Sequence, residues 1–200
     1  EYNVLLVVSA GNHDLGWTNN PQEAEEILAS YPDFLFDPQC GLCEPATAAI
    51  PITVGAIAEH DIPAISAGPR SEDIMRTIAV AQEPTPTTRI GPGLNGAVKP
   101  EFVAPGGNLA FRGFSNIRQV RDEQGLAVMS FSNEPTRSLF AFDIGTSLAA
   151  PFVSRSAAMM LASLRQYFGE EPDANLLRAI LASAAEVPVP SDDRIQVHRG

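Results

Sequence analysis

Positive charge is scarce in this sequence. Its 200 residues contain 13 Lys plus Arg against 24 Asp plus Glu, which gives a formal net charge of −11. A protein that binds a nucleic-acid backbone needs a surplus of cations along its contact surface, so this balance argues against such a partner. We therefore expect no nucleic-acid-binding function.

Cysteine is also scarce, because Cys40 and Cys43 are the only two in the sequence. A structural zinc site needs four ligands and a second pair is missing, so we expect no metal and no other cofactor. A local disulfide and two free thiols both remain open. Free thiols would indicate a reducing compartment.

Long hydrophobic runs are missing as well. No unbroken apolar run reaches the ~18 residues that span a bilayer, and the first residues lack the basic, hydrophobic and small-residue pattern of a signal peptide. We therefore expect no membrane partner. Hydrophobic residues still make up 44% of the chain, which is enough for the core of one domain.

What the sequence does contain is a serine at the predicted start of a helix. Residues 152–168 carry only two charges, Arg155 and Arg165, in an otherwise apolar and small-residue run, which predicts a helix buried on nearly all sides. Pro151 has no N–H and is tolerated in a first turn, so Ser147 is expected at the helix N-terminus. There the helix dipole and unpaired N–H groups favour the oxyanion that a serine nucleophile creates, and Gly145 permits a sharp turn before it. An ordinary N-cap on a buried helix is the alternative.

An asparagine follows a predicted strand near the start of the chain. Residues 4–8 form an unbroken apolar run, typical of a parallel strand covered on both faces, and lead into Ser9-Ala10-Gly11-Asn12. Ligands of open α/β sheets bind beyond the carboxyl ends of strands, where the Asn12 amide can donate to an oxyanion. A simple Gly-Asn turn is the alternative.

Four ordered blocks of the sequence resemble those of a subtilisin-like serine protease, a subtilase. They are Val7-Val8-Ser9-Ala10-Gly11-Asn12, Ile52-Thr53-Val54-Gly55-Ala56, Lys99-Pro100-Glu101-Phe102-Val103-Ala104-Pro105-Gly106 and the nucleophile motif from Gly145 to Pro151. The resemblance continues through residues 176–181 and so covers nearly the whole chain. It implies an α/β fold in three layers, with a parallel sheet flanked by helices, of which residues 1–200 form a partial catalytic domain without its N-terminal part.

This resemblance also implies the function and the site. The chain would be the C-terminal part of a serine endopeptidase domain that hydrolyses polypeptides through an acyl-enzyme. Ser147 would be the nucleophile and Asn12 the oxyanion donor. The segment Ser9, Ala10 and Gly11 would bind the substrate.

Two catalytic motifs of the family have no match in these 200 residues. The family places an Asp-Ser/Thr-Gly and a His-Gly-Thr motif upstream of the oxyanion asparagine, and neither His13, His60 nor His198 stands in such a motif. Because a serine hydroxyl without a base is a weak nucleophile, we expect this chain to be inactive without the N-terminal half of the domain. A rewired triad with His60 and Asp61 stays open, as does a non-catalytic subtilase-like binding or regulatory module.

Other segments bear on the location of the protein and on the rim of the site. Residues 44–48 and 91–93 resemble a bacterial intracellular subtilase branch, often found with a partner ATPase, which implies a cytoplasmic location. Asn20, Pro21 and Glu23 predict a short helix through Ser30.

The interval between Asn12 and Ile52 looks longer than in secreted subtilisins, and it either rims the substrate cleft or is a neutral insertion. Prolines and glycines in residues 83–93 predict a loop.

Overall fold

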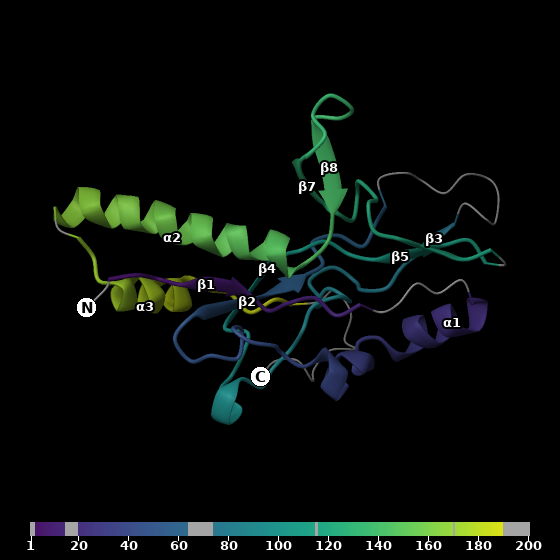
Figure 1. The fold of residues 1–200 in the computed structure, drawn as a ribbon, viewed down its shortest axis with the longest axis horizontal. Helices are drawn as coiled ribbons and strands as arrows, with labels where there is room; N and C mark the ends of the chain where they lie inside the picture. Colours follow the sequence, from purple (N-terminus) through teal and green to yellow (C-terminus); the bar gives the residue numbers. More distant parts are fainter. Residues whose placement is uncertain (1–2, 15–19, 64–73, 115, 170, 190–200) are drawn as a thin grey trace.

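The central sheet of this computed structural model is parallel, as the sequence predicts. The structure describes residues 3–14, 20–63, 74–114, 116–169 and 171–189. Strands β1 (Val7–Ser9), β2 (Ile52–Ile57) and β4 (Phe102–Pro105) lie in the order β1-β2-β4, and both outer strands run parallel to β2. The expected α/β fold, with a parallel sheet flanked by helices, is confirmed (Figure 1).

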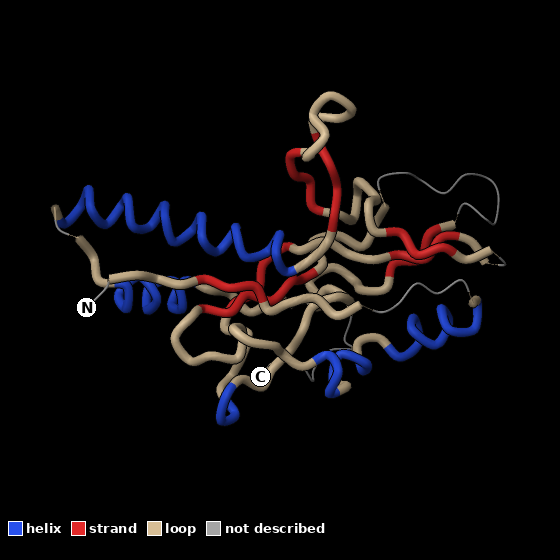
Figure 2. Tube along the Cα trace, in the orientation of Figure 1, coloured by secondary structure: helices blue, strands red, loops and turns tan. Residues whose placement is uncertain are grey.

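Two smaller antiparallel sheets accompany the central one. One contains β3 (Met75–Thr77), β5 (Ala110–Arg112) and β6 (Arg118–Val120), and the other pairs β7 (Val128–Phe131) with β8 (Phe140–Asp143). Figure 2 shows the β7–β8 ribbon projecting away from the rest of the chain. β8 leads directly into the start of the long helix α2 (Thr146–Phe168).

Strand β2 is the buried centre of the sheet. All six of its residues are buried, and Gly55 lets the chain approach its neighbour, because a Cβ there would lie 2.8 Å from the Pro100 ring. The predicted strand over residues 4–8 is wrong at its first half, since β1 begins at Val7 and Leu6 is 51% exposed. The reason is the register: β2 begins at Ile52, opposite Val7, so the parallel ladder stops there.

Helix α2 packs on the sheet through one face only. Its buried residues are Thr146, Ala149, Val153 and Ala157, spaced so that they form a single stripe against β1, β2 and β4. The prediction of burial on nearly all sides is therefore wrong, and Met159 on another face is 57% exposed. Helix α2 also contacts α3 (Ala174–Ala184).

By length and composition alone, α2 also meets the criterion for a membrane-spanning helix. It has 23 residues with a mean hydropathy of 1.2 over its most apolar window. Core helices of soluble proteins pass the same test, and the first half of α2 lies against the sheet.

Both shorter helices begin at capping side chains. Helix α1 (Pro21–Ser30) starts where the Asn20 side chain accepts a 2.9 Å hydrogen bond from the Gln22 N–H, as the sequence predicts. Helix α3 is capped in the same way by Asp173, and its Leu177 and Leu181 are buried. Three short 3₁₀ helices lie between α1 and β4 in the sequence, namely η1 (Asp33–Phe36), η2 (Pro38–Cys40) and η4 (Leu94–Gly96).

The two cysteines are free thiols, with Cys40 buried and Cys43 exposed. Of the two alternatives left open by the sequence, the structure therefore has free thiols rather than a local disulfide. In the described ranges, no three His, Cys, Asp or Glu side chains gather in a way that can hold a metal ion.

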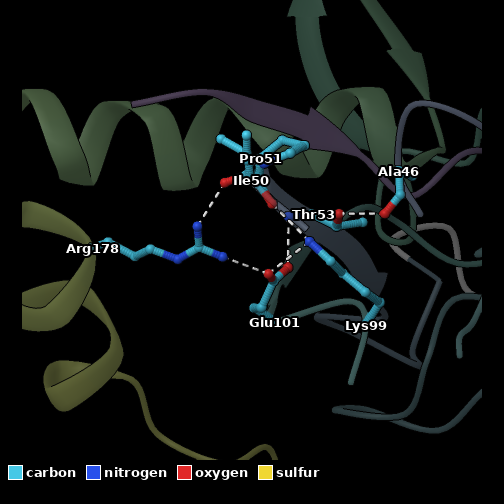
Figure 3. Close-up of polar contacts among 7 residues, drawn as sticks. All are labelled: Ala46, Ile50, Pro51, Thr53, Lys99, Glu101 and Arg178. Atoms are coloured by element: carbon cyan, nitrogen blue, oxygen red, sulfur yellow. Dashed lines mark hydrogen bonds and ion pairs between the residues drawn. The ribbon is translucent and has the colours of Figure 1, made fainter. Parts of the chain in front are cut away.

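A charged cluster fastens the amino ends of the strands to α3 (Figure 3). The Glu101 carboxylate accepts hydrogen bonds from Lys99 Nζ and from Arg178 Nη2, each at 2.7 Å, and from the Thr53 N–H at 2.8 Å. The Lys99 side chain is only 2% exposed and also donates to the Pro51 carbonyl at 2.7 Å. Because these partners come from β2, from the segment before β4 and from α3, the cluster fixes three elements at one end of the sheet.

Substituting Glu101 tests the importance of this cluster. Glu101→Ala leaves the buried Lys99 ammonium without its carboxylate, so we expect a loss of about 3–5 kcal/mol in the free energy of unfolding. The measurement is urea unfolding of the protein.

The matched control is Glu134→Ala, which removes a carboxylate that is 62% exposed and lies 3.7 Å from Arg137. An exposed pair of this kind contributes about 0–1 kcal/mol. Similar losses for the two variants would contradict the assigned role of Glu101.

Candidate active site

Three chain segments meet at the carboxyl ends of β1 and β4. Asn12 follows β1, Gly106 follows β4, and Gly145 stands at the N-cap of α2. The Gly145 N–H donates to the Gly106 carbonyl at 2.8 Å, and the Thr146 N–H donates to Asn12 Oδ1 at 2.9 Å. These bonds join segments that lie far apart in the sequence.

The Asn12 side chain is oriented by Thr146. Asn12 Oδ1 accepts from the Thr146 N–H and, at 3.2 Å, from the Thr146 hydroxyl, which itself accepts from the Gly11 N–H at 3.1 Å. The amide oxygen faces α2. This orientation leaves Nδ2, the donor end of the amide, for another acceptor. Nowhere in the described part of the chain does an acceptor bond to Asn12 Nδ2.

Ser147 occupies the first turn of α2, as the sequence predicts. Its side chain is exposed, and the first N–H groups of a helix have no partner four residues back. Gly145 adopts φ +147, and a Cβ there would lie 2.9 Å from Asn12 Nδ2. Glycine is therefore required for Asn12 to lie against the start of the helix.

The histidines do not reach Ser147 in the described ranges. The His13 N–H donates to the Thr87 carbonyl at 2.7 Å, and His60 is exposed, with its carbonyl accepting from Asn108. The Asp61 carboxylate accepts from the Ala81 N–H at 3.3 Å. Neither His13 nor His60 forms a hydrogen bond with Ser147, and His198 lies outside the described residues.

The segment Ser9, Ala10 and Gly11 is held by backbone hydrogen bonds. Ser9 pairs with Val54, and Ala10 is 1% exposed and donates its N–H to the Val54 carbonyl at 2.8 Å. The Gly11 N–H bonds to the Thr146 hydroxyl. The substrate-binding role of this segment stays a prediction from the resemblance.

Sequence reasoning missed the segment that supports Asn12 from its other side. Thr88 forms an isolated antiparallel bridge with Asn12, and the Arg89 N–H donates to the Gly11 carbonyl at 3.1 Å. Thr85, Thr87 and Thr88 are all buried, although residues 83–93 read as a plain loop. The run of β-branched threonines was the available signal for extended, packed backbone.

A depression of about 390 Å³ lies in the part of the chain that follows Asn12. His13, the residue after Asn12, lines it together with the carboxylates of Glu23, Glu26 and Asp37, and with Cys40. Burial raises the pKa of the Cys40 thiol, the Asp37 carboxylate raises it further, and the Arg89 guanidinium opposes both. The long interval after Asn12 thus forms a wall of this depression.

Tyr31 connects the interval between Asn12 and Ile52 to the segment that begins at Pro84, because its hydroxyl donates to the Pro84 carbonyl. Burial, with a further contribution from Glu83, raises the pKa of the Tyr31 hydroxyl well above its ordinary value. Tyr31 therefore stays protonated and remains a donor at neutral pH.

Comparison with known proteins places this arrangement in context. The sequence model of the Subtilase family matches residues 1–198. A Sinorhizobium fredii protein described as uncharacterized protein y4bN is 36% identical over 198 residues, an alignment that covers 98% of this chain and 44% of that protein. The chain therefore spans less than half the length of this relative. No solved structure matches the chain.

Gly145→Ala tests the contact between α2 and Asn12. The φ and ψ of Gly145 are accessible mainly to glycine, so we expect a loss of about 1–3 kcal/mol in the free energy of unfolding from the backbone alone. Overlap of the new methyl group with Asn12 Nδ2 should add to this loss. Thermal unfolding of the protein measures it.

Gly169→Ala is the matched control, because Gly169 also has a positive φ, +72, but a Cβ there meets nothing within 4 Å. Its expected loss is about 1–2 kcal/mol. If Gly145→Ala costs no more than Gly169→Ala, the close approach of Asn12 is wrong.

Proposed function

Because this chain belongs to the subtilase family, we propose that it forms the nucleophile-bearing part of a serine endopeptidase. In this proposal Ser147 attacks the carbonyl of a peptide bond and Asn12 stabilises the oxyanion. The observation that supports it most is the 2.9 Å hydrogen bond from the Thr146 N–H to Asn12 Oδ1. This bond brings the amide of Asn12 beside the residue next to Ser147.

The proposed chemistry follows from the orientation of these groups. Attack by Ser147 Oγ forms a tetrahedral intermediate, whose oxyanion accepts from the Ser147 N–H and from Asn12 Nδ2. The positive end of the α2 dipole favours the same negative charge. Loss of the amine leaves an acyl-enzyme on Ser147, which water then hydrolyses.

We also propose that the general base is a histidine of the same protein outside these 200 residues. Within the described ranges Ser147 has no histidine partner, and the relative from Sinorhizobium fredii is more than twice as long as the part that this chain matches. The base takes the Ser147 proton during attack and returns it to the leaving amine. A non-catalytic binding or regulatory module of the same family is the competing proposal, favoured by the absence of a histidine partner of Ser147 among the described residues.

Peptide hydrolysis and labelling with a fluorophosphonate separate the two proposals. We expect the full-length protein to do both, Ser147→Ala to abolish both, and Asn12→Ala to lower kcat by about 10²–10³ with little change in KM. These 200 residues alone should do neither, since Ser147 then has no base.

The control is Ser154→Ala, which removes another exposed serine of α2, whose hydroxyl donates to the Ala150 carbonyl. It should keep full activity. Normal hydrolysis by Ser147→Ala would refute the protease proposal, and a full-length protein that neither hydrolyses peptides nor labels would favour the non-catalytic module.

A further inference from the structure

The side chain of Arg89 crosses between two segments that border the candidate site. Its Nε donates to the Asn12 carbonyl at 3.1 Å, and its Nη1 donates to the carbonyls of Gln39 and Gly41 at 2.8 Å and 2.7 Å. All three acceptors are backbone carbonyls. Arg89 thereby links the loop after β1 to the end of η2.

The remaining contacts of Arg89 hold the same short stretch of backbone. Its own N–H donates to the Gly11 carbonyl, and its stem packs on Gly11, where a Cβ would lie 3.1 Å from Arg89 Cδ. Gly11 has φ +94, a conformation that few residues other than glycine adopt. Arg89 therefore bonds to the backbone carbonyls of Gly11 and Asn12, while Thr146 bonds to the Asn12 side chain.

An arginine suits this task better than other cations. The planar guanidinium offers several donors in a fixed fork, whereas a lysine offers one compact ammonium on a flexible stem. In the described ranges Arg89 forms no ion pair. Its side-chain hydrogen bonds therefore hold neutral backbone carbonyls in place.

We propose that Arg89 is a positioning residue for Asn12 in the oxyanion hole. This inference rests on the proposed protease function and goes beyond it by assigning a residue that touches neither Ser147 nor the reacting atoms. An oxyanion donor acts only when it is already aimed at the developing charge, and a displacement of about 1 Å can cost about 10²-fold in rate. Loss of the Arg89 side chain removes the bond to the Asn12 carbonyl, which lets this backbone shift and so misplaces Nδ2.

A double-mutant cycle in the full-length protein tests this coupling. We expect Arg89→Ala to lower kcat by at least about 10-fold, with KM within about threefold, when Asn12 is present. In the Asn12→Ala background the same substitution should change kcat by less than about twofold, because the donor that Arg89 positions is then absent. Rates are given per active site, counted by fluorophosphonate titration.

Two further variants keep the test decisive. Arg89→Lys retains the charge and part of the hydrogen bonding, so its kcat should lie below that of the wild type and, where Arg89→Ala folds, above that of Arg89→Ala. Arg137→Ala, which removes an arginine that is 85% exposed, should leave kcat unchanged.

Equal fold losses from Arg89 substitution with and without Asn12 would overturn the inference, because they would show a general structural effect. So would an Arg89→Lys variant with the kcat of the wild type. Failure of the proposed function itself looks different, since either the full-length protein would then neither hydrolyse peptides nor label, or Ser147→Ala would retain activity.

Discussion

The hydrogen bond from the Thr146 N–H to Asn12 Oδ1 is the contact on which the whole site depends. It joins residues 134 positions apart and sets the start of α2 against the loop that follows β1. Gly145 provides the space for it, and the bond from the Gly145 N–H to the Gly106 carbonyl ties β4 into the same corner. A nucleophile and an oxyanion donor from distant parts of the chain are useful only if such a contact fixes their relative position.

The rest of the fold keeps the two ends of this contact still. β2 is buried along its whole length, and α2 lies across it through a stripe of small residues. At the other end of the strands, the Glu101 cluster binds β2 and α3 together (Figure 3). Loops that carry chemistry on a rigid scaffold are a common division of labour in α/β proteins. Here the polar cluster and the candidate site occupy opposite ends of one sheet.

Local sequence patterns predicted many of the helices and strands. They did not predict the contacts between distant segments. Gly145 correctly indicated that Ser147 lies in the first turn of a helix, although Pro151, expected in that turn, lies inside α2 instead. The apolar run before Asn12 correctly indicated a parallel strand. The same hydrophobicity misled over residues 4–6 and the outer face of α2, because composition does not reveal where a neighbouring element ends. Arg89 was missed because backbone carbonyls from distant segments leave no pattern in the sequence. Its role follows only from the fold.

A crystal structure of the full-length protein with a peptide phosphonate would show directly whether Ser147 and Asn12 act on the same carbonyl. The phosphonate mimics the tetrahedral intermediate, and its phosphoryl oxygen stands where the oxyanion forms. We expect a covalent bond from Ser147 Oγ to phosphorus, with that oxygen about 2.7–3.1 Å from both Asn12 Nδ2 and the Ser147 nitrogen. An adduct on another residue, or a phosphoryl oxygen turned away from Asn12, would contradict it.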